Sequence, residues 1–170
     1  KYSDLGFYLF HSILEKNIKI DIENYLKQEF FNPIEAFRIQ YNPIKNYPKK
    51  NIIPTEKDRV FRKQLLHGFV HDPGAALFGG ISLHAGLFSN AIDLSKLFQL
   101  YLDEGIYNDH SFFSKKTIKY FTNAPFKAQN NRRGVFFDKP SLDSNNLNVY
   151  AGVSNLSYGH TGFTGTMAWI

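Results

Sequence analysis

The sequence contains no cysteine, one tryptophan and one methionine among its 170 residues. The absence of cysteine excludes disulfide bonds, zinc–thiolate sites and thiol nucleophiles. It leaves the cellular compartment open, because proteins of oxidising compartments can also lack cysteine. No apolar run approaches the roughly 20 residues that a membrane-spanning helix requires, so a membrane span is not expected.

The sequence has a small excess of positive charge. Lysine and arginine number 20 against 15 acidic residues, which gives a formal net charge of +5. The lysines are scattered among acidic residues and accompany no ladder of stacking aromatic residues, so a nucleic-acid partner is not expected. A hydrophobic content of 43% and an aromatic content of 16% indicate a folded domain with its own core.

Three segments contain the residues that indicate a functional site. Residues 158–166 read Tyr-Gly-His-Thr-Gly-Phe-Thr-Gly-Thr, and the chain opens with Lys-Tyr-Ser-Asp-Leu-Gly. Between them, residues 71–91 contain His-Asp-Pro-Gly-Ala-Ala, a Gly-Gly pair and His-Ala-Gly-Leu-Phe-Ser-Asn-Ala. The glycines of the last motif let a strand backbone approach a ligand closely, and the hydroxyl residues between them offer hydrogen bonds.

Together these segments resemble the β-lactamase and penicillin-binding serine hydrolases, class C β-lactamases included. In that family a Tyr-x-Asn motif starts a helix, and Lys-Thr-Gly or a His-Thr-Gly variant lies on a strand beside the nucleophile. The resemblance extends over essentially the whole chain. It is closest to the serine-hydrolase domain that follows a family 3, β-N-acetylglucosaminidase-like glycoside hydrolase in some Gram-negative envelope proteins.

The resemblance implies an α+β fold. A five-stranded antiparallel sheet would be flanked by helices, with a helical subdomain beside it and the active site in the cleft between them. The family's nucleophile lies in Ser-x-x-Lys, but no serine here is followed by lysine three positions later. Because that motif precedes the tyrosine motif, we expect it upstream of Lys1. Residues 1–170 would then be the C-terminal part of a single, N-terminally truncated domain.

By resemblance, Tyr2 is the catalytic phenol that relays a proton beside the missing serine and lysine. A tyrosine with an ordinary pKa near ~10 acts as a base near neutral pH only beside positive charge. Asp4 stands where the family has asparagine and would bind substrate. An ionised carboxylate only accepts hydrogen bonds, so the change favours a partner that donates. A plain helix-capping role for Asp4 is equally open.

His160 stands where the more familiar motif has lysine, and we expect it to act as a catalytic, substrate-facing residue. An imidazole recognises a carboxylate less strongly than an ammonium group does. Thr161 and Gly162 would line the strand edge as substrate-binding residues. The backbone N–H of Phe163 would be one donor of the oxyanion hole. The resemblance implies no metal and no cofactor.

Two other patterns are interpreted as structural. His67 and His71 are four residues apart and precede Asp72, a metal-ligand spacing on a helix, but glycine and proline follow at once. Ser82 lies in a Gly-x-Ser-x-His run that resembles a nucleophile elbow, except that His84 occupies a position where the sharp turn needs glycine. We expect His84 to be buried and hydrogen-bonded, ordering the glycine-rich segment.

Apolar residues at helical spacing, each set preceded by a capping residue, predict four helices. They cover about residues 3–16, 21–31, 89–103 and 114–121. The proline-containing stretch 41–55 is predicted to be a surface connection, and 67–87 a buried, tightly turned segment. Strands are predicted at 134–137 and 158–170, the latter being two strands joined by a turn near 163–165.

The leading hypothesis is a serine hydrolase that cleaves an ester or amide through an acyl-enzyme. Its substrate would be a small molecule or cell-wall-derived material in the periplasm or cell envelope, and an upstream domain would belong to the same chain. Two alternatives stay open. One is a non-catalytic module that binds a glycan or peptide or supports a partner domain. The other is a protein whose activity lies wholly in an upstream glycosidase (β-N-acetylhexosaminidase) domain. A Ser-x-x-Lys before Lys1 would favour the enzyme over the non-catalytic module, and assays of the separated domains would decide whether the activity lies in the glycosidase.

Overall fold

The computed structural model describes residues 3–141, 143, 145–150 and 152–170. The chain divides into two compact units, Lys1–Leu97 and Phe98–Ile170, each of which is described by itself. Within the described residues, helices and short strands alternate along the chain. No helix in this part of the chain is long and apolar enough to span a membrane.

The first unit begins with two helices that the sequence predicts. The helix α1 spans Leu5–Asn17, and α2 spans Ile22–Leu26 and continues as a π-helical turn over Lys27–Phe31. The Asp21 carboxylate accepts a hydrogen bond from the backbone N–H of Asn24 and so caps α2. Both predicted helices are confirmed.

The apolar face of α1 is exposed. Leu5, Leu9 and Ile13 recur at helical spacing but are 73%, 65% and 45% exposed. The buried residue of the helix is His11, on a different face. The spacing therefore predicted the helix correctly, but it did not predict which face packs within this chain.

The proline-containing connection is more buried than predicted. It begins with the strand β1 (Gln40–Tyr41) and includes 3-10 turns at Pro43–Lys45 and Lys49–Asn51. Tyr41 is buried, and its hydroxyl donates to the carbonyl oxygen of Ser82 at 3.0 Å. The prediction of a surface connection is wrong at its first residues, because Tyr41 packs inward and satisfies its hydroxyl there.

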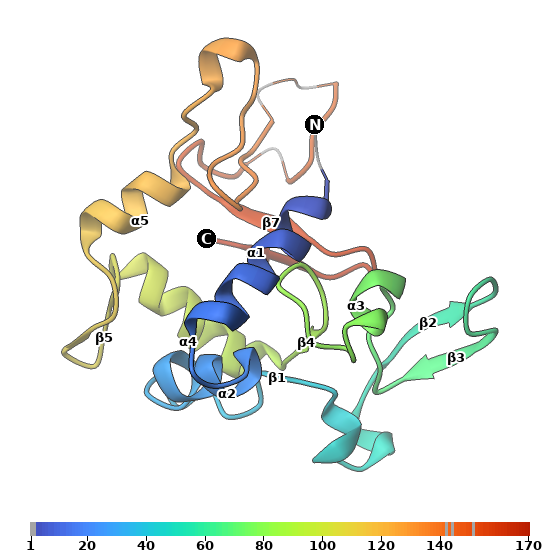
Figure 1. Cartoon of the computed structure of the whole chain (residues 1–170). Coiled ribbons are helices and arrows are strands. Elements are labelled where there is room, and N and C mark those ends of the chain that lie inside the picture. The colour runs from blue at the N-terminus through green and yellow to red at the C-terminus, as the bar shows by residue number, and fades with distance from the viewer. Residues whose placement is uncertain (1–2, 142, 144, 151) are drawn as a thin grey trace. The chain divides into compact units, whose positions relative to one another are not determined.

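A β-hairpin absent from the prediction follows. The strand β2 (Pro54–Asp58) pairs antiparallel with β3 (Gln64–His67) (Figure 1). The Asp58 carboxylate holds the connecting loop by accepting backbone N–H groups of Val60, Phe61 and Arg62 at 2.9–3.0 Å. This loop has no Asn-Gly or Asp-Gly pair, so the usual sequence signal of a hairpin is missing.

The glycine-rich segment is tightly turned, as predicted, but it is only partly buried, because Phe69 and Leu77 are exposed. It contains the short helix α3 (Pro73–Leu77) and ends at β4 (Leu87–Phe88), which pairs antiparallel with β1. Gly86 has φ +117°, and a Cβ there would lie 3.1 Å from the Tyr41 ring and against the backbone of Gly80. Only glycine fits where these backbones approach each other.

The helix α4 (Ala91–Leu102) starts in the first unit and ends in the second. Asn90 caps it as predicted, because its side-chain oxygen accepts the backbone N–H of Asp93 at 2.8 Å. Leu100 is its most buried residue. Its apolar residues Leu94, Leu97 and Tyr101 are half-buried.

The second unit continues with a small hairpin of β5 (Ile106–Tyr107) and β6 (His110–Ser111). The predicted helix follows as α5 (Lys115–Thr122), capped by Ser114, whose hydroxyl oxygen accepts the N–H of Thr117. A 3-10 turn at Lys127–Gln129 comes next.

The strand predicted at 134–137 is not formed. Phe136 has φ +69°, outside the extended region, and the N–H of Gly134 bonds to the carbonyl of Phe137 within the same loop. Pairing begins only at Asp138, which forms an isolated bridge with Gly159. Apolar composition indicated a strand here, but the positive φ value closes the segment into a loop.

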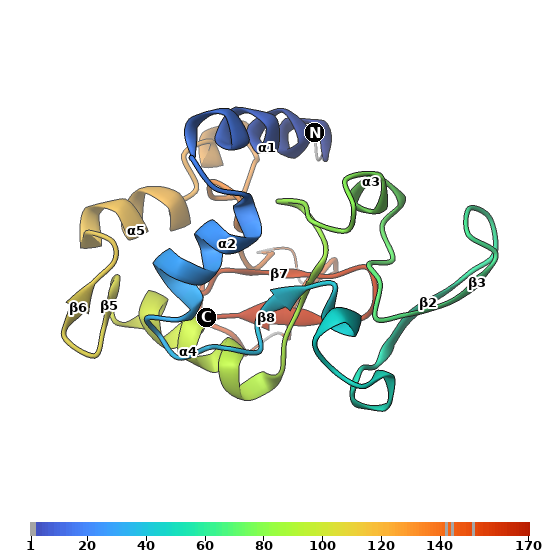
Figure 2. The ribbon, with the colours of Figure 1, turned by 60° about the horizontal axis from the view of Figure 1, so that its bottom comes forward.

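The chain ends in the hairpin that the sequence predicts. The strand β7 (Gly159–Thr161) pairs antiparallel with β8 (Met167–Trp169), and Figure 2 shows the two side by side. The five-stranded sheet implied by the resemblance is not present among the described residues. The named strands form four separate two-stranded antiparallel pairs. The combination of helices and antiparallel strands is as expected, whereas the single sheet is a correction.

Candidate functional site

The N-terminal motif is described only in part, because Tyr2 lies outside the described residues. Asp4 immediately precedes α1 in a helical conformation, and its carboxylate makes no capping hydrogen bond. The hydroxyl of Ser3 accepts the backbone N–H of Leu5 at 3.3 Å instead. Of the two interpretations of Asp4, helix capping is therefore wrong, and the substrate-binding role stays a prediction.

His160 lies on β7 and is held at both ring nitrogens. Its Nδ1 is 2.7 Å from the carbonyl oxygen of Thr161, and its Nε2 is 3.3 Å from Nη1 of Arg133. A carbonyl oxygen only accepts and a guanidinium only donates, so these contacts assign the ring hydrogen to Nδ1 and the lone pair to Nε2. Sequence reasoning did not identify Arg133, which the fold brings against His160 from 27 positions away.

Arg133 is fixed by a buried carboxylate. Oδ2 of Asp138 accepts Nη2 of Arg132 at 2.8 Å, Nη2 of Arg133 at 3.2 Å and Nδ2 of Asn148 at 3.2 Å. The backbone of Asp138 is bridged to Gly159, the first residue of β7. The two arginines thus attach through one carboxylate to the strand that carries the His-Thr-Gly motif. The only feature of the sequence that could have indicated Arg133 is the Arg-Arg dipeptide, which does not differ from an ordinary basic pair on a protein surface.

The other residues of the motif lie at an accessible edge. The N–H and C=O of Gly159 point away from β8 and bond to Asp138. Since backbone groups alternate along an antiparallel strand, those of Thr161 face this same edge. Thr161 and Gly162 are exposed, and Phe163 is exposed in the turn after β7. Their predicted substrate and oxyanion contacts need such exposure, and those roles stay predictions.

A Ser-His-Asp hydrogen-bonded chain lies in the first unit. The Ser82 hydroxyl is 2.8 Å from Nδ1 of His84, and Nε2 of His84 is 2.9 Å from Oδ1 of Asp72. The same Oδ1 accepts the backbone N–H of Ala75 at 2.7 Å and so caps α3. Tyr8 of α1 packs edge-on against the His84 ring, with 4.9 Å between ring centroids.

The hydrogen bonds among Ser82, His84 and Asp72 order the glycine-rich segment. Ser82 is 2% exposed, so its hydroxyl cannot meet a substrate despite its triad-like partners. Burial by itself would raise the pKa of Asp72, but the Ala75 N–H and the His84 imidazole lower that pKa below its ordinary value. The prediction that His84 is buried and hydrogen-bonded is confirmed, and its partners join α1, α3 and the glycine-rich segment.

The histidine pair that resembles a metal motif has other partners. Nε2 of His67 is 2.6 Å from the carbonyl oxygen of Ile52, and Asp72 binds His84. Burial lowers the pKa of His71. Among the residues that the structure describes, no group of three histidine or acidic side chains is arranged to hold a metal ion.

Comparison with known proteins identifies the family. The sequence is 35% identical to the N-acetylmuramyl-L-alanine amidase of Bacillus subtilis (strain 168) over 181 residues. It is 31% identical to the putative D-alanyl-D-alanine carboxypeptidase of Escherichia coli O157:H7 over the same length.

Each of these two alignments covers 99% of this chain and 41% of the relative, so the chain spans less than half the length of these relatives. No solved structure matches the chain significantly. The family model described as Beta-lactamase matches residues 1–170, and the chain therefore belongs to the beta-lactamase family.

Proposed function

We propose that this chain supplies the tyrosine motif and the His-Thr-Gly strand of a serine hydrolase that cleaves an amide bond in the peptide part of cell-wall material. The observation that carries the proposal is a family match over residues 1–170 that includes both motifs. The relatives' names, an amidase and a D-alanyl-D-alanine carboxypeptidase, favour an amide over an ester. The periplasm or cell envelope is where such a substrate is found. A fused glycosidase domain stays a secondary proposal.

The proposed reaction needs a nucleophile from outside this sequence, because no Ser-x-x-Lys occurs in it. The 41% coverage of the relatives supports a longer protein. The exposed apolar face of α1, formed by Leu5, Leu9 and Ile13, supports it as well. A face of this kind usually packs against another part of its protein.

In this mechanism the serine oxygen attacks the amide carbonyl, and its proton passes through the Tyr2 phenol to the leaving amine. The backbone N–H of Phe163 donates to the oxyanion that forms. Water then attacks the acyl-enzyme, and its proton returns to the serine as the ester bond breaks. Arg133, fixed beside His160, supplies the positive charge that a lysine provides in the more familiar motif.

Active-site labelling tests this function. A fluorophosphonate or a fluorescent penicillin is expected to label the protein expressed from its complete gene at the serine of a Ser-x-x-Lys motif. The 170-residue chain alone should take up no label. Stoichiometric labelling of a serine within this chain, Ser82 included, would contradict the proposal. A complete gene without Ser-x-x-Lys would leave the non-catalytic module as the function.

His160→Lys is expected to alter selectivity more than turnover. The contacts of His160 with Thr161 and Arg133 are those of a neutral imidazole, whereas a lysine carries a positive charge. Added to the Arg133 charge, the lysine should raise the kcat/KM ratio of acidic over neutral peptide substrates by about 3–10-fold.

The control is His110→Lys, at an exposed position on β6. It should leave the substrate ratio unchanged. If the ratio does not change in His160→Lys either, His160 does not face the substrate. Its contacts with Arg133 and Thr161 would then be purely structural.

A further inference from the structure

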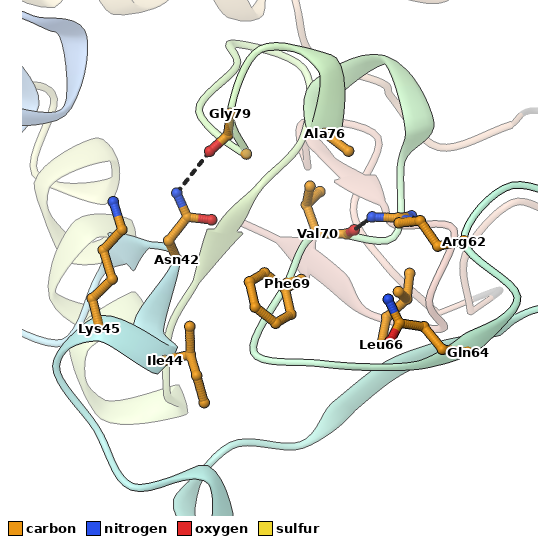
Figure 3. Close-up of a pocket in the computed structure, with 11 residues that line it drawn as sticks. Asn42, Ile44, Lys45, Arg62, Gln64, Leu66, Phe69, Val70, Ala76 and Gly79 are labelled. Atoms are coloured by element: carbon orange, nitrogen blue, oxygen red, sulfur yellow. Dashed lines mark hydrogen bonds between the residues drawn. The ribbon is translucent and has the colours of Figure 1, made fainter.

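A pocket of about 370 Å³ lies between the β2–β3 hairpin and the glycine-rich segment (Figure 3). Its size falls in the range of roughly 300–1,000 Å³ that is usual for small-molecule sites. Ile44, Phe69, Val70 and Ala76 give it apolar walls, and all of its lining residues belong to the first unit. Apolar walls with a few polar groups are the composition of a ligand site.

Asn42 directs a hydrogen-bond acceptor into this pocket. The residue is 7% exposed, and its Nδ2 donates to the carbonyl oxygen of Gly79 at 2.9 Å. In Figure 3 its Oδ1 points the other way, into the pocket. No residue of the described chain donates a hydrogen bond to this oxygen. Because this oxygen opens onto the pocket and takes no donor from the described part of the protein, it is available to accept a hydrogen bond from a ligand.

The orientation of this acceptor is fixed by the backbone. Asn42 precedes the 3-10 turn Pro43–Lys45, where an asparagine commonly caps the turn, yet it makes no capping bond. It adopts a left-handed conformation with φ 44°, which asparagine tolerates better than most residues. A Cβ at Gly80 would collide with Asn42 Oδ1, so this glycine leaves the oxygen its place. The acceptor is therefore held in position before any ligand arrives.

The pocket rim carries one uncompensated positive charge. Arg62 is neutralised, because its Nε lies 3.1 Å from the Asp58 carboxylate while Nη1 donates to the carbonyl of Val70 at 2.7 Å. Backbone N–H donors, that of Arg62 first, hold the pKa of Asp58 well below its usual range, so the carboxylate stays ionised. Lys45 is exposed and pairs with no acidic side chain among the described residues. It is the group that can attract an anion.

We propose that this pocket binds an N-acyl amino acid, either free or as the C-terminal residue of a short peptide. The amide N–H of the ligand donates to Asn42 Oδ1, its apolar side chain lies against Ile44 and Phe69, and its carboxylate pairs with Lys45. The amide N–H, the side chain and the carboxylate of this ligand class thus each have a partner in the pocket. The inference goes beyond the proposed function, because none of these contacts requires serine chemistry.

The experiment uses the protein expressed from its complete gene and N-acetyl-L-leucine as the probe, with binding measured by NMR titration. A ligand of this size should bind with a Kd of about 1 mM. The N-methylated analogue lacks the donor for Asn42, the carboxamide lacks the charge for Lys45, and N-acetylglycine lacks the apolar side chain. Each should bind about 5–10-fold more weakly. An N-acetylated tetrapeptide ending in leucine distinguishes a free N-acyl amino acid from a peptide C-terminus as the ligand. It should bind as tightly as N-acetyl-L-leucine only if the pocket accommodates the end of a peptide.

Matched variants locate the site. Ala76→Phe fills the pocket and should abolish binding, whereas Leu77→Phe, at the next and exposed position of α3, should not. Lys45→Gln should weaken the binding of N-acetyl-L-leucine by about 3–5-fold and leave the binding of the carboxamide unchanged. Lys49→Gln, at a position outside the pocket lining, should change the binding of neither ligand. Protein whose hydrolase serine is blocked by fluorophosphonate should bind the probe as before. Labelling therefore tests the proposed hydrolase function, and probe binding tests the pocket, independently of each other.

Three results would overturn the proposal. These are no saturable binding by the wild type, equal affinity for the parent probe and its N-methyl and carboxamide analogues, or unchanged binding by Ala76→Phe. The analogue series uses only the wild-type protein. It decides the question even if Ala76→Phe does not fold, which circular dichroism would reveal.

Discussion

Tyr2→Phe in the full-length protein is expected to lower turnover by about 10²–10⁴-fold, the range for loss of a proton-transfer group. The substitution removes one hydroxyl and no packing volume, so the protein should fold nearly as before. Its effect should fall on kcat more than on KM, because the phenol moves a proton in the transition state and does not hold the ground-state substrate. The prediction depends on the match of residues 2–4 to the family motif, since Tyr2 lies outside the described residues.

Steady-state kinetics with a peptide substrate and a urea unfolding curve measure the two parts of this prediction. The matched control is Tyr120→Phe, which makes the same change at an exposed position on α5 and should leave turnover unchanged. A turnover of Tyr2→Phe within about threefold of the wild type would exclude the phenol from proton transfer. A large loss accompanied by unfolding would instead mark Tyr2 as a structural residue.

The elements that sequence reasoning predicted well are those with local signals. Asp21, Asn90 and Ser114 cap their helices with their own side chains, so each start is readable from a few neighbouring residues. The hairpin of β2 and β3 carries no such signal, because its loop is held by Asp58 and not by a glycine turn. The segment at 134–137 has strand-like composition, and the positive φ of Phe136 overrides it.

The candidate sites depend on contacts between distant positions, which a single sequence does not reveal. His84 was recognised as a buried, hydrogen-bonded residue, but its partner Asp72 lies 12 positions away. The contact of Arg133 with His160 spans 27 positions, and that of Asn42 with Gly79 spans 37. Arg133 and Asn42 belong to no motif that sets them apart from ordinary polar residues, and Asp72 was noted only for its place in a metal-like pattern. The motifs predict candidate functional residues, whereas the fold determines which other groups contact them.

Asp72→Ala is expected to destabilise the protein by about 2–4 kcal/mol. The change removes the cap of α3, which is worth roughly 1 kcal/mol, and leaves the Ala75 N–H and the buried His84 Nε2 without their acceptor. Asp72→Asn should cost less, about 1 kcal/mol, because an amide oxygen in the place of Oδ1 can accept both N–H groups. Ser82→Ala should cost about 1 kcal/mol, since it removes only the donor to His84 Nδ1.

The stabilisation by the Asp72 charge should depend on pH in a defined direction. The pKa of Asp72 is lowered in the folded state, so its ionised form contributes stability above the ordinary aspartate pKa of about 4. This contribution is lost as the pH falls through the lowered folded-state pKa. Urea unfolding at a series of pH values should therefore show the wild type and Asp72→Asn converging in acid. A difference that grows as the pH falls, or Ser82→Ala and Asp72→Asn costing as much as Asp72→Ala, would contradict this account of the Ser82–His84–Asp72 chain.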